Sequence, residues 1–195
     1  MAFREEIFRP VDPFIKEPAW FSWWSDDSSL FTIRPLCLLN DLNILYDWID
    51  GAKRMGIYVD KAFQHPLIRR YKMLLESSES QSFLIEKNGR PVCQLDITPT
   101  QHDEMHLSFH TSADDYLLDY ILDYRNRQNQ GFADVLRFFV SFYYSFPGPG
   151  SLYIMVDGRE SDYNTPVPEA GFQFCAEVQL NQIPLNLYRI DGIPL

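Results

Sequence analysis

Residues 116–146 read YLLDYILDYRNRQNQGFADVLRFFVSFYYSF and predict a buried strand, a polar loop and a helix in succession. Residues 116–123 are mostly apolar and lack Gly and Pro, as is typical of a largely buried strand. From Gly131 onward the apolar side chains recur at i, i+3, i+4 and i+7 and form one helical face, at Phe132, Val135, Leu136, Phe139, Val140, Tyr143 and Phe146. The Pro-Gly-Pro-Gly run at 147–150 ends the helix, because proline removes a helical hydrogen bond and glycine permits the turn.

The loop before Gly131 is suited to binding a phosphate group. The first turn of a helix has unpaired N–H groups and a partial positive charge, and Arg125 and Arg127 add full charges. Gly131 has no side chain, so a ligand can come close to the backbone. The alternative is an ordinary turn from strand to helix in which both arginines are solvated.

The spacing Gln128-x-x-Gly131-x-Ala133 resembles the pyrophosphate-binding signature of the GNAT superfamily of N-acyltransferases. The resemblance implies that acetyl-CoA or another acyl-CoA is the cosubstrate. Its pantetheine arm would lie in a V-shaped split between strands near 116–123 and 151–157. The residues implied to bind the cofactor are Ile121, Leu122, Arg125, Arg127, Gln128, Asn129, Gln130, Gly131, Phe132 and Ala133.

The flanking segments extend the resemblance over about residues 30–190. The pattern predicts a strand at 30–36, helices at 42–49 and around 66–76, and a hairpin that turns at Asn88-Gly89. The stretch IRPL…DLNILYDWID and the predicted final strand pair, residues 171–178 with Leu187-Tyr188, are similar to the siderophore-biosynthesis group of these acyltransferases. The implied fold class is α/β (α+β): a mixed, mostly antiparallel, twisted sheet flanked by helices.

The segments outside this pattern lead to two further expectations. Residues 1–29 are predicted to be an aromatic-rich arm and residues 30–195 a single acyltransferase domain. The tryptophans at 20, 23 and 24 either pack on the domain in an arm or hairpin, or form a lid over the acyl pocket. Residues 158–170 can form at most a short helix, because Pro166 and Pro168 interrupt them.

Composition and charge restrict the class of partner. The net charge of −10 makes nucleic acid an unsuitable partner, because phosphate backbones select basic surfaces. The sequence has no signal peptide and no apolar run near 20 residues, so we expect a cytoplasmic protein that does not contact a membrane. Cys37, Cys93 and Cys175 are widely spaced in apolar runs and are predicted to be buried free thiols.

Three histidines, His102, His106 and His110, recur every four residues. On a helix they would share a face, but no pattern of Cys or carboxylate ligands accompanies them, so no metal is predicted. The segment is equally compatible with a strand, and the histidines are then substrate-facing or surface residues.

The catalytic residues follow from the resemblance. The siderophore group relies on a His in the central strand and on an Asp after the next strand, and the matching positions here hold Asp119 and Asp157. Asp119 acts as the base if burial raises its pKa toward neutrality, or else pairs with a neighbour in a chain that has lost or changed its activity. His106 and His110 are candidates to replace the missing histidine, and Tyr120 and Tyr124 are candidate acids for the leaving thiolate.

These patterns lead to one main hypothesis and two alternatives. The main one is an acyl-CoA-dependent N-acyltransferase, or acetyltransferase, that acts on an amine or hydroxylamine of a small molecule in siderophore biosynthesis; aminoglycosides are a second class of cationic acceptor. The first alternative is a GNAT-like domain that binds acyl-CoA or a partner without turnover. The second is an aromatic-lined small-molecule binder. Exposed edge strands of this fold often pair, so a homodimer is an expectation.

Overall fold

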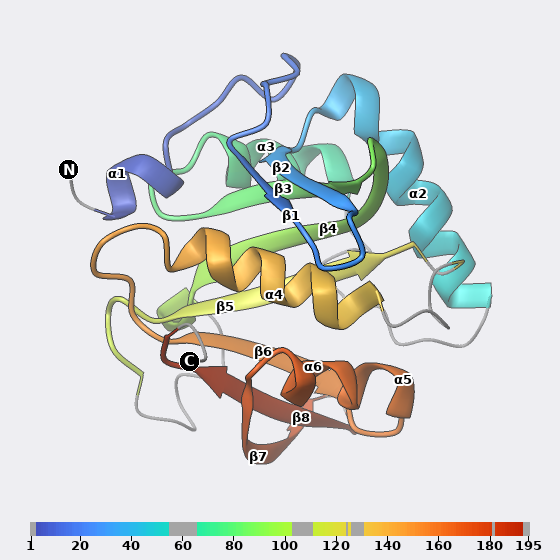
Figure 1. Cartoon of the computed structure of the whole chain (residues 1–195), viewed down its shortest axis with the longest axis vertical. Coiled ribbons are helices and arrows are strands. Elements are labelled where there is room, and N and C mark those ends of the chain that lie inside the picture. Colours follow the sequence, from blue (N-terminus) through green and yellow to red (C-terminus); the bar gives the residue numbers. More distant parts are fainter. Residues whose placement is uncertain are drawn as a thin grey trace. The chain divides into compact units, whose positions relative to one another are not determined.

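The computed structural model describes residues 3–54, 66–102, 111–123, 125, 131–180 and 182–192 (Figure 1). The helices and strands are α1 (Phe3–Ile7), β1 (Phe21–Trp24), β2 (Leu30–Pro35), α2 (Leu38–Arg54), α3 (Leu67–Leu75), β3 (Gln81–Lys87), β4 (Arg90–Pro99), η2 (Thr100–His102), β5 (Tyr116–Leu122), α4 (Gly131–Tyr143), β6 (Leu152–Asp157), α5 (Ser161–Asn164), α6 (Pro166–Glu169), β7 (Gln173–Leu180) and β8 (Ile183–Ile190). Among the described helices, none has the length and apolar character needed to cross a membrane.

The strands follow the order β1-β2-β3-β4-β5-β6-β8-β7. β2 pairs antiparallel with β1 and β3, and β8 pairs antiparallel with β6 and β7, whereas β5 and β6 are parallel. This mixed, mostly antiparallel sheet with flanking helices confirms the predicted fold class. The chain divides into two compact units, one of residues 8–96 and 120–127 and the other of residues 1–7, 97–119 and 128–195.

The core of the 8–96/120–127 unit forms where α2 and α3 pack on its strands. Both helices present buried apolar side chains at helical spacing. These side chains pack with strand residues in one cluster that includes Leu36, Leu45, Trp48, Ile49, Tyr71, Leu75, Leu84 and Ile121. The predicted hairpin is confirmed as β3–β4, with Asn88 at φ 52° and Gly89 at φ 75°, as a tight turn of this kind requires.

The N-terminal aromatic residues pack on this same unit. β1 pairs with β2, and the ring of Trp23 lies 5.9 Å from that of Phe31. Trp20 meets Phe83 edge-to-face at 5.6 Å, and the Arg9 guanidinium lies 4.3 Å from the Trp20 ring. The expected hairpin is therefore present as β1 and β2, with Trp20 and Trp23 packed against the strands, whereas the Trp24 side chain is 65% exposed.

The other unit is built around α4, which is buried on more than one face. Besides the predicted apolar positions, Phe138 and Phe142 are also buried, whereas Arg137 is exposed. The helix ends at Tyr143 rather than at Phe146 as predicted. Its last turn tightens, because Ser145 N–H donates to Phe142 O at 3.2 Å, three residues back, before the chain reaches Pro147.

Two further expectations have clear outcomes. Residues 158–170 contain only two four-residue helices, α5 and α6, which confirms the expected effect of the prolines. The prediction that all three cysteines are buried is wrong for Cys175, which is exposed, although Cys37 and Cys93 are buried. The β7–β8 register shifts between Phe174 and Ala176, which makes Cys175 the bulged residue, and it is exposed like Glu177 and Gln179 further along β7.

Candidate functional site

The parallel strands β5 and β6 are paired over three residues each. Tyr116 lies opposite Leu152 and Leu118 opposite Ile154, and the pairing stops there. β6 continues to Asp157 and pairs with β8 over its whole length. Asp119, which is partly buried, is thus the first residue of β5 beyond the paired segment.

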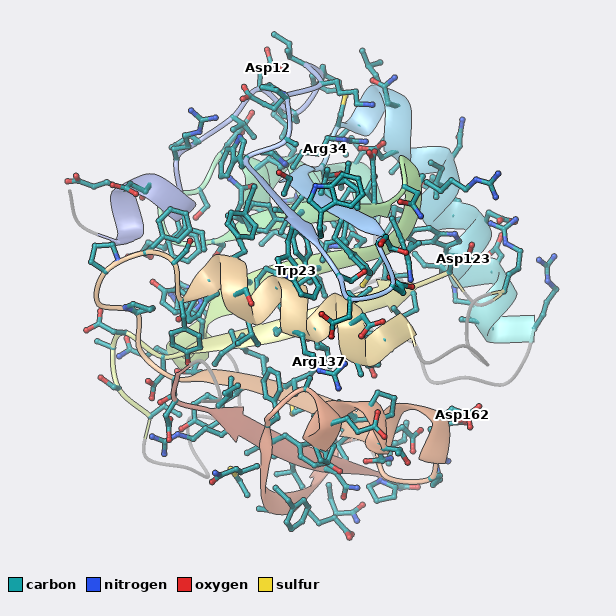
Figure 2. All side chains as sticks on the ribbon, in the orientation of Figure 1. Asp12, Trp23, Arg34, Asp123, Arg137 and Asp162 are labelled. Atoms are coloured by element: carbon teal, nitrogen blue, oxygen red, sulfur yellow. The ribbon has the colours of Figure 1, made fainter. Side chains whose placement is uncertain are left out.

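The start of α4 lies in the same unit and is open. A Cβ atom added at Gly131 would have no described atom within 4 Å, so a ligand can approach the backbone there. The acidic residue of the first turn, Asp134, does not obstruct this position, because its Oδ1 accepts a hydrogen bond from Arg137 Nη1 at 2.8 Å, one turn further along. Arg137, labelled in Figure 2, also donates from Nη2 to Glu169 O at 3.0 Å. The N–H groups of the first turn keep the polarity that suits an anion.

Asp157, at the end of β6, is buried and held by Arg159. The backbone N–H and Nε of Arg159 donate to Asp157 Oδ1 at 3.0 and 2.9 Å, and Nη2 donates to Oδ2 at 2.5 Å. These hydrogen bonds hold the pKa of Asp157 below its usual value, against the opposing effect of burial. Asp157 is therefore an ionised, engaged carboxylate, and taking a proton would cost it this pairing.

Asn164 organises the segment after β6 and was not singled out from the sequence. Its Nδ2 donates to the carbonyls of Asp157 and Glu160 at 2.7 and 2.8 Å. Its Oδ1 accepts from Asn186 Nδ2 at 2.8 Å and from Tyr188 OH at 3.0 Å. One amide thus ties the end of β6 to β8. An Asn directly before the Thr165-Pro166 break was the available signal, because such residues commonly satisfy backbone groups at turns.

Of the predicted cofactor residues, three that the structure describes belong to the 8–96/120–127 unit. Arg125 follows β5, and its backbone N–H and Nε donate to Asp123 Oδ1 at 3.1 and 2.8 Å. Its guanidinium also lies 3.4 Å from Asp47 on α2. Ile121 is buried in the apolar cluster of this unit, and Leu122 is partly buried. The side chain of Ile121 is therefore part of the apolar core.

The remaining predicted residues are divided between the α4 unit and parts of the chain outside the described residues. Phe132 and Ala133 are buried in the first turn of α4, behind Gly131. Arg127, Gln128, Asn129, Gln130, Tyr124, His106 and His110 lie outside the described residues. His102 is exposed in η2. Within the described ranges, no group of three His, Cys, Asp or Glu side chains is arranged to hold a metal ion.

Comparison with known proteins gives a result at the level of the fold. No protein-family model and no curated protein matches the sequence. An uncharacterised protein from Bacillus halodurans superposes with a TM-score of 0.74 at 15% identity, over 88% of this chain and 89% of that one. RimL, a ribosomal L7/L12 α-N-protein acetyltransferase in complex with coenzyme A, superposes with a TM-score of 0.65 at 10% identity, over 91% of this chain and 98% of that one.

A third solved structure is AAC(6')-Ib in complex with paromomycin and acetyl-CoA. It superposes with a TM-score of 0.63 at 15% identity, over 83% of this chain and 93% of that one. At identities this low, the superpositions show a shared fold and do not identify the substrate. The strand order, the parallel pairing of β5 with β6 and these superpositions together show that the chain has the GNAT fold of these acetyltransferases.

Proposed function

We propose that the chain is an acyl-CoA-dependent N-acyltransferase that moves an acyl group to an amine or hydroxylamine of a small molecule. The observation that carries this proposal is the end of β5–β6 pairing one residue before Asp119, in a unit whose α4 begins at an open Gly131. Such an arrangement offers a thioester backbone groups where the strands part and offers a diphosphate the N–H groups of a helix start. The acetyltransferases of the same fold in complex with coenzyme A add support.

The reaction needs positioning more than it needs many side chains. The acceptor nitrogen attacks the thioester carbonyl carbon, the C–S bond breaks and CoA leaves as a thiolate. A backbone N–H of the parted strand segment polarises the carbonyl oxygen as negative charge develops on it. Asp119 takes the proton of the attacking nitrogen, directly or through water, and the thiolate is then protonated. Holding the two reactants together supplies a large part of the rate.

Asp157 has a supporting role in this proposal. Because Arg159 keeps it ionised and engaged, it is better suited to fixing the end of β6 than to accepting a proton. Asn164 adds to this by bonding the Asp157 carbonyl and the Tyr188 hydroxyl at once. Asp119 is therefore the residue that we expect to carry proton transfer.

The acceptor is expected to be cationic. A net charge of −10 raises the local concentration of positively charged small molecules. Hydroxylamines of siderophore precursors, polyamines and aminoglycosides are the classes to test. The first of these follows from the sequence resemblance, and the last is the class that AAC(6')-Ib binds in its structure.

Calorimetry followed by a thiol-release assay tests the proposal. Acetyl-CoA and CoA should bind at micromolar concentration, and acceptor amines should then release free thiol from acetyl-CoA. An absence of binding by both acyl-CoA and CoA would sink the proposal.

One alternative function has a specific basis. The chain has Asp119 where the resemblance expects His, and the segment after β6 is broken into α5 and α6 by prolines. A domain that binds acyl-CoA without turnover is consistent with both features. Tight binding of acetyl-CoA with no thiol release across the three acceptor classes would favour this alternative.

A further inference from the structure

An open hollow of about 590 Å³ lies in the 8–96/120–127 unit, beside the β3–β4 turn. It is lined by the turn, by the first residues of β4 and by the segment after β5, through Lys87, Asn88, Arg90, Val92, Asp123 and Arg125. The Asp123 N–H donates to Val92 O at 3.1 Å, so the start of β4 and the end of β5 are joined at its wall. Asp123 is labelled in Figure 2, where β5 ends.

Asp123 supplies the one carboxylate among the described residues that line the hollow, and it is engaged in hydrogen bonds. Asp123 is 8% exposed, and it accepts two hydrogen bonds from Arg125. It therefore orients the Arg125 guanidinium. Arg125 also pairs with Asp47, but those two side chains are 58% and 47% exposed, and an exposed ion pair of this kind contributes little free energy against a better ligand.

Of the other two cations, Arg90 is exposed, whereas the Lys87 side chain is 29% exposed, against 58% for Arg125. Lys87 Nζ lies 3.2 Å from Asp27 Oδ2 and 5.2 Å from the Phe31 ring, and the Asp27 side chain is 59% exposed. Arg90 is exposed, and no ion pair joins it to any part of the chain that the structure describes. In a chain with a net charge of −10, three cationic side chains around one concave surface form a local positive charge, which suits an anionic ligand.

We propose that this hollow binds a phosphate monoester. Guanidinium groups bind phosphate oxygens through paired N–H donors, and an ammonium group adds a compact charge. Arg90 and the oriented Arg125 supply the guanidinium groups, and Lys87 supplies the ammonium group. The phosphate comes from one of two sources: the 3′-phosphate of CoA, which rests on the proposed function, or a phosphate carried by another compound.

The first experiment uses inorganic phosphate and does not depend on CoA. The full chain, labelled with ¹⁵N, is titrated while sodium chloride holds the ionic strength constant. Saturable shifts of amide signals should be confined to residues 87–92 and 123–125. Arg90→Gln should weaken binding roughly tenfold, because it removes a charge-assisted contact.

Arg69→Gln is the matched control. Arg69 is an exposed arginine on α3 of the same unit, has no ion pair with a described residue, and loses the same charge. It should bind phosphate as the parent chain does. Equal weakening in both variants, or shifts that do not saturate, would overturn the proposal.

Titration with CoA and with 3′-dephospho-CoA identifies the source. If Arg90→Gln weakens CoA binding about tenfold and leaves 3′-dephospho-CoA unaffected, the hollow takes the 3′-phosphate of CoA. If phosphate fills the hollow while CoA binds without shifting these signals, the phosphate belongs to another compound. A chain that binds phosphate there but binds neither CoA nor 3′-dephospho-CoA retains the anion site and loses the proposed acyl-CoA function.

Discussion

Arg34 and Asp41 form a buried ion pair with two contacts, Nη1 to Oδ2 at 2.7 Å and Nη2 to Oδ1 at 2.9 Å. Their side chains are only 6% and 3% exposed. Asp41 Oδ2 also accepts the Cys37 N–H at 2.8 Å, and Arg34 Nη2 lies 3.2 Å from Glu86 Oε1. One arginine on β2 therefore joins the start of α2 to β3.

Removing the carboxylate of this pair should strongly destabilise the fold. Asp41→Ala leaves the Arg34 charge buried with Glu86 as its remaining carboxylate partner, and we expect the free energy of unfolding to fall by about 3–5 kcal/mol. Urea denaturation measures the change. Lys72→Ala, which breaks an exposed pair with Glu76 at 3.8 Å, is the control and should cost less than about 1 kcal/mol. Similar losses of unfolding free energy in the two variants would show that the buried pair stabilises the fold no more than the exposed pair does.

Gly150 is a position where any side chain must displace the backbone. A Cβ atom there would lie 2.2 Å from Asp114 O, and the Gly150 N–H donates to the same carbonyl at 3.1 Å. Gly150→Ala should therefore lower the unfolding free energy by about 1–3 kcal/mol or more. Thermal and urea unfolding measure this loss, and an unchanged midpoint would contradict the close approach.

Gly131→Ala should separate binding from stability. An added Cβ meets no described atom within 4 Å, so the unfolding free energy should change by less than about 1 kcal/mol. A methyl group in front of the first turn of α4 should nevertheless hinder the diphosphate of CoA. We expect calorimetry to show CoA binding weakened about tenfold or more; full affinity in a stable variant would remove Gly131 from the binding site.

Asp119→Asn tests the proton acceptor. Loss of a general base lowers kcat by about 10²–10⁴-fold, and the Kd for acetyl-CoA should remain unchanged because the side chain is not needed for binding. Asp50→Asn, at an exposed position of α2, is the control for loss of one negative charge. Unchanged turnover in Asp119→Asn would exclude the residue from catalysis.

The Asp157–Arg159 pair predicts a loss of stability in acid. The pKa of Asp157 is lowered in the folded chain, so the unfolded chain binds the proton more readily, and stability falls as pH drops below the unfolded pKa. The contribution is complete above the unfolded pKa, near 3.9, and is lost as pH drops through the folded pKa. Asp157→Asn should flatten the plot of unfolding free energy against pH in this range, and parallel plots for the two chains would contradict the pairing.

The sequence was sufficient for the order of elements and insufficient for several of their ends. A mostly apolar run without Gly or Pro located β5, the period-3.6 pattern located α4, and Asn88-Gly89 between apolar runs located the β3–β4 hairpin. α2 runs from Leu38 to Arg54, well beyond the predicted 42–49, and the buried residues of its added turns include Asp41, Gly51 and Ala52, which do not extend an apolar pattern.

The candidate site could be predicted less well than the fold. Asp157 was predicted because the resemblance places an aspartate at this position. Its partner Arg159 and the link through Asn164 depend on how the chain folds after β6, which the sequence does not show. The basic hollow was also missed. Its cations come from residues 87–90 and from residue 125, and only the fold places positions so far apart in the sequence around one surface.

The bulge at Cys175 has a practical consequence for every activity measurement proposed above. A reagent that detects the thiol released from CoA will also react with this exposed cysteine, whereas Cys37 and Cys93 are shielded in the core. Partial desolvation raises the pKa of Cys175 and slows that reaction near neutral pH, so the interference develops as a drift and not as a single burst. A Cys175→Ser chain removes this background and leaves any remaining colour attributable to the cosubstrate.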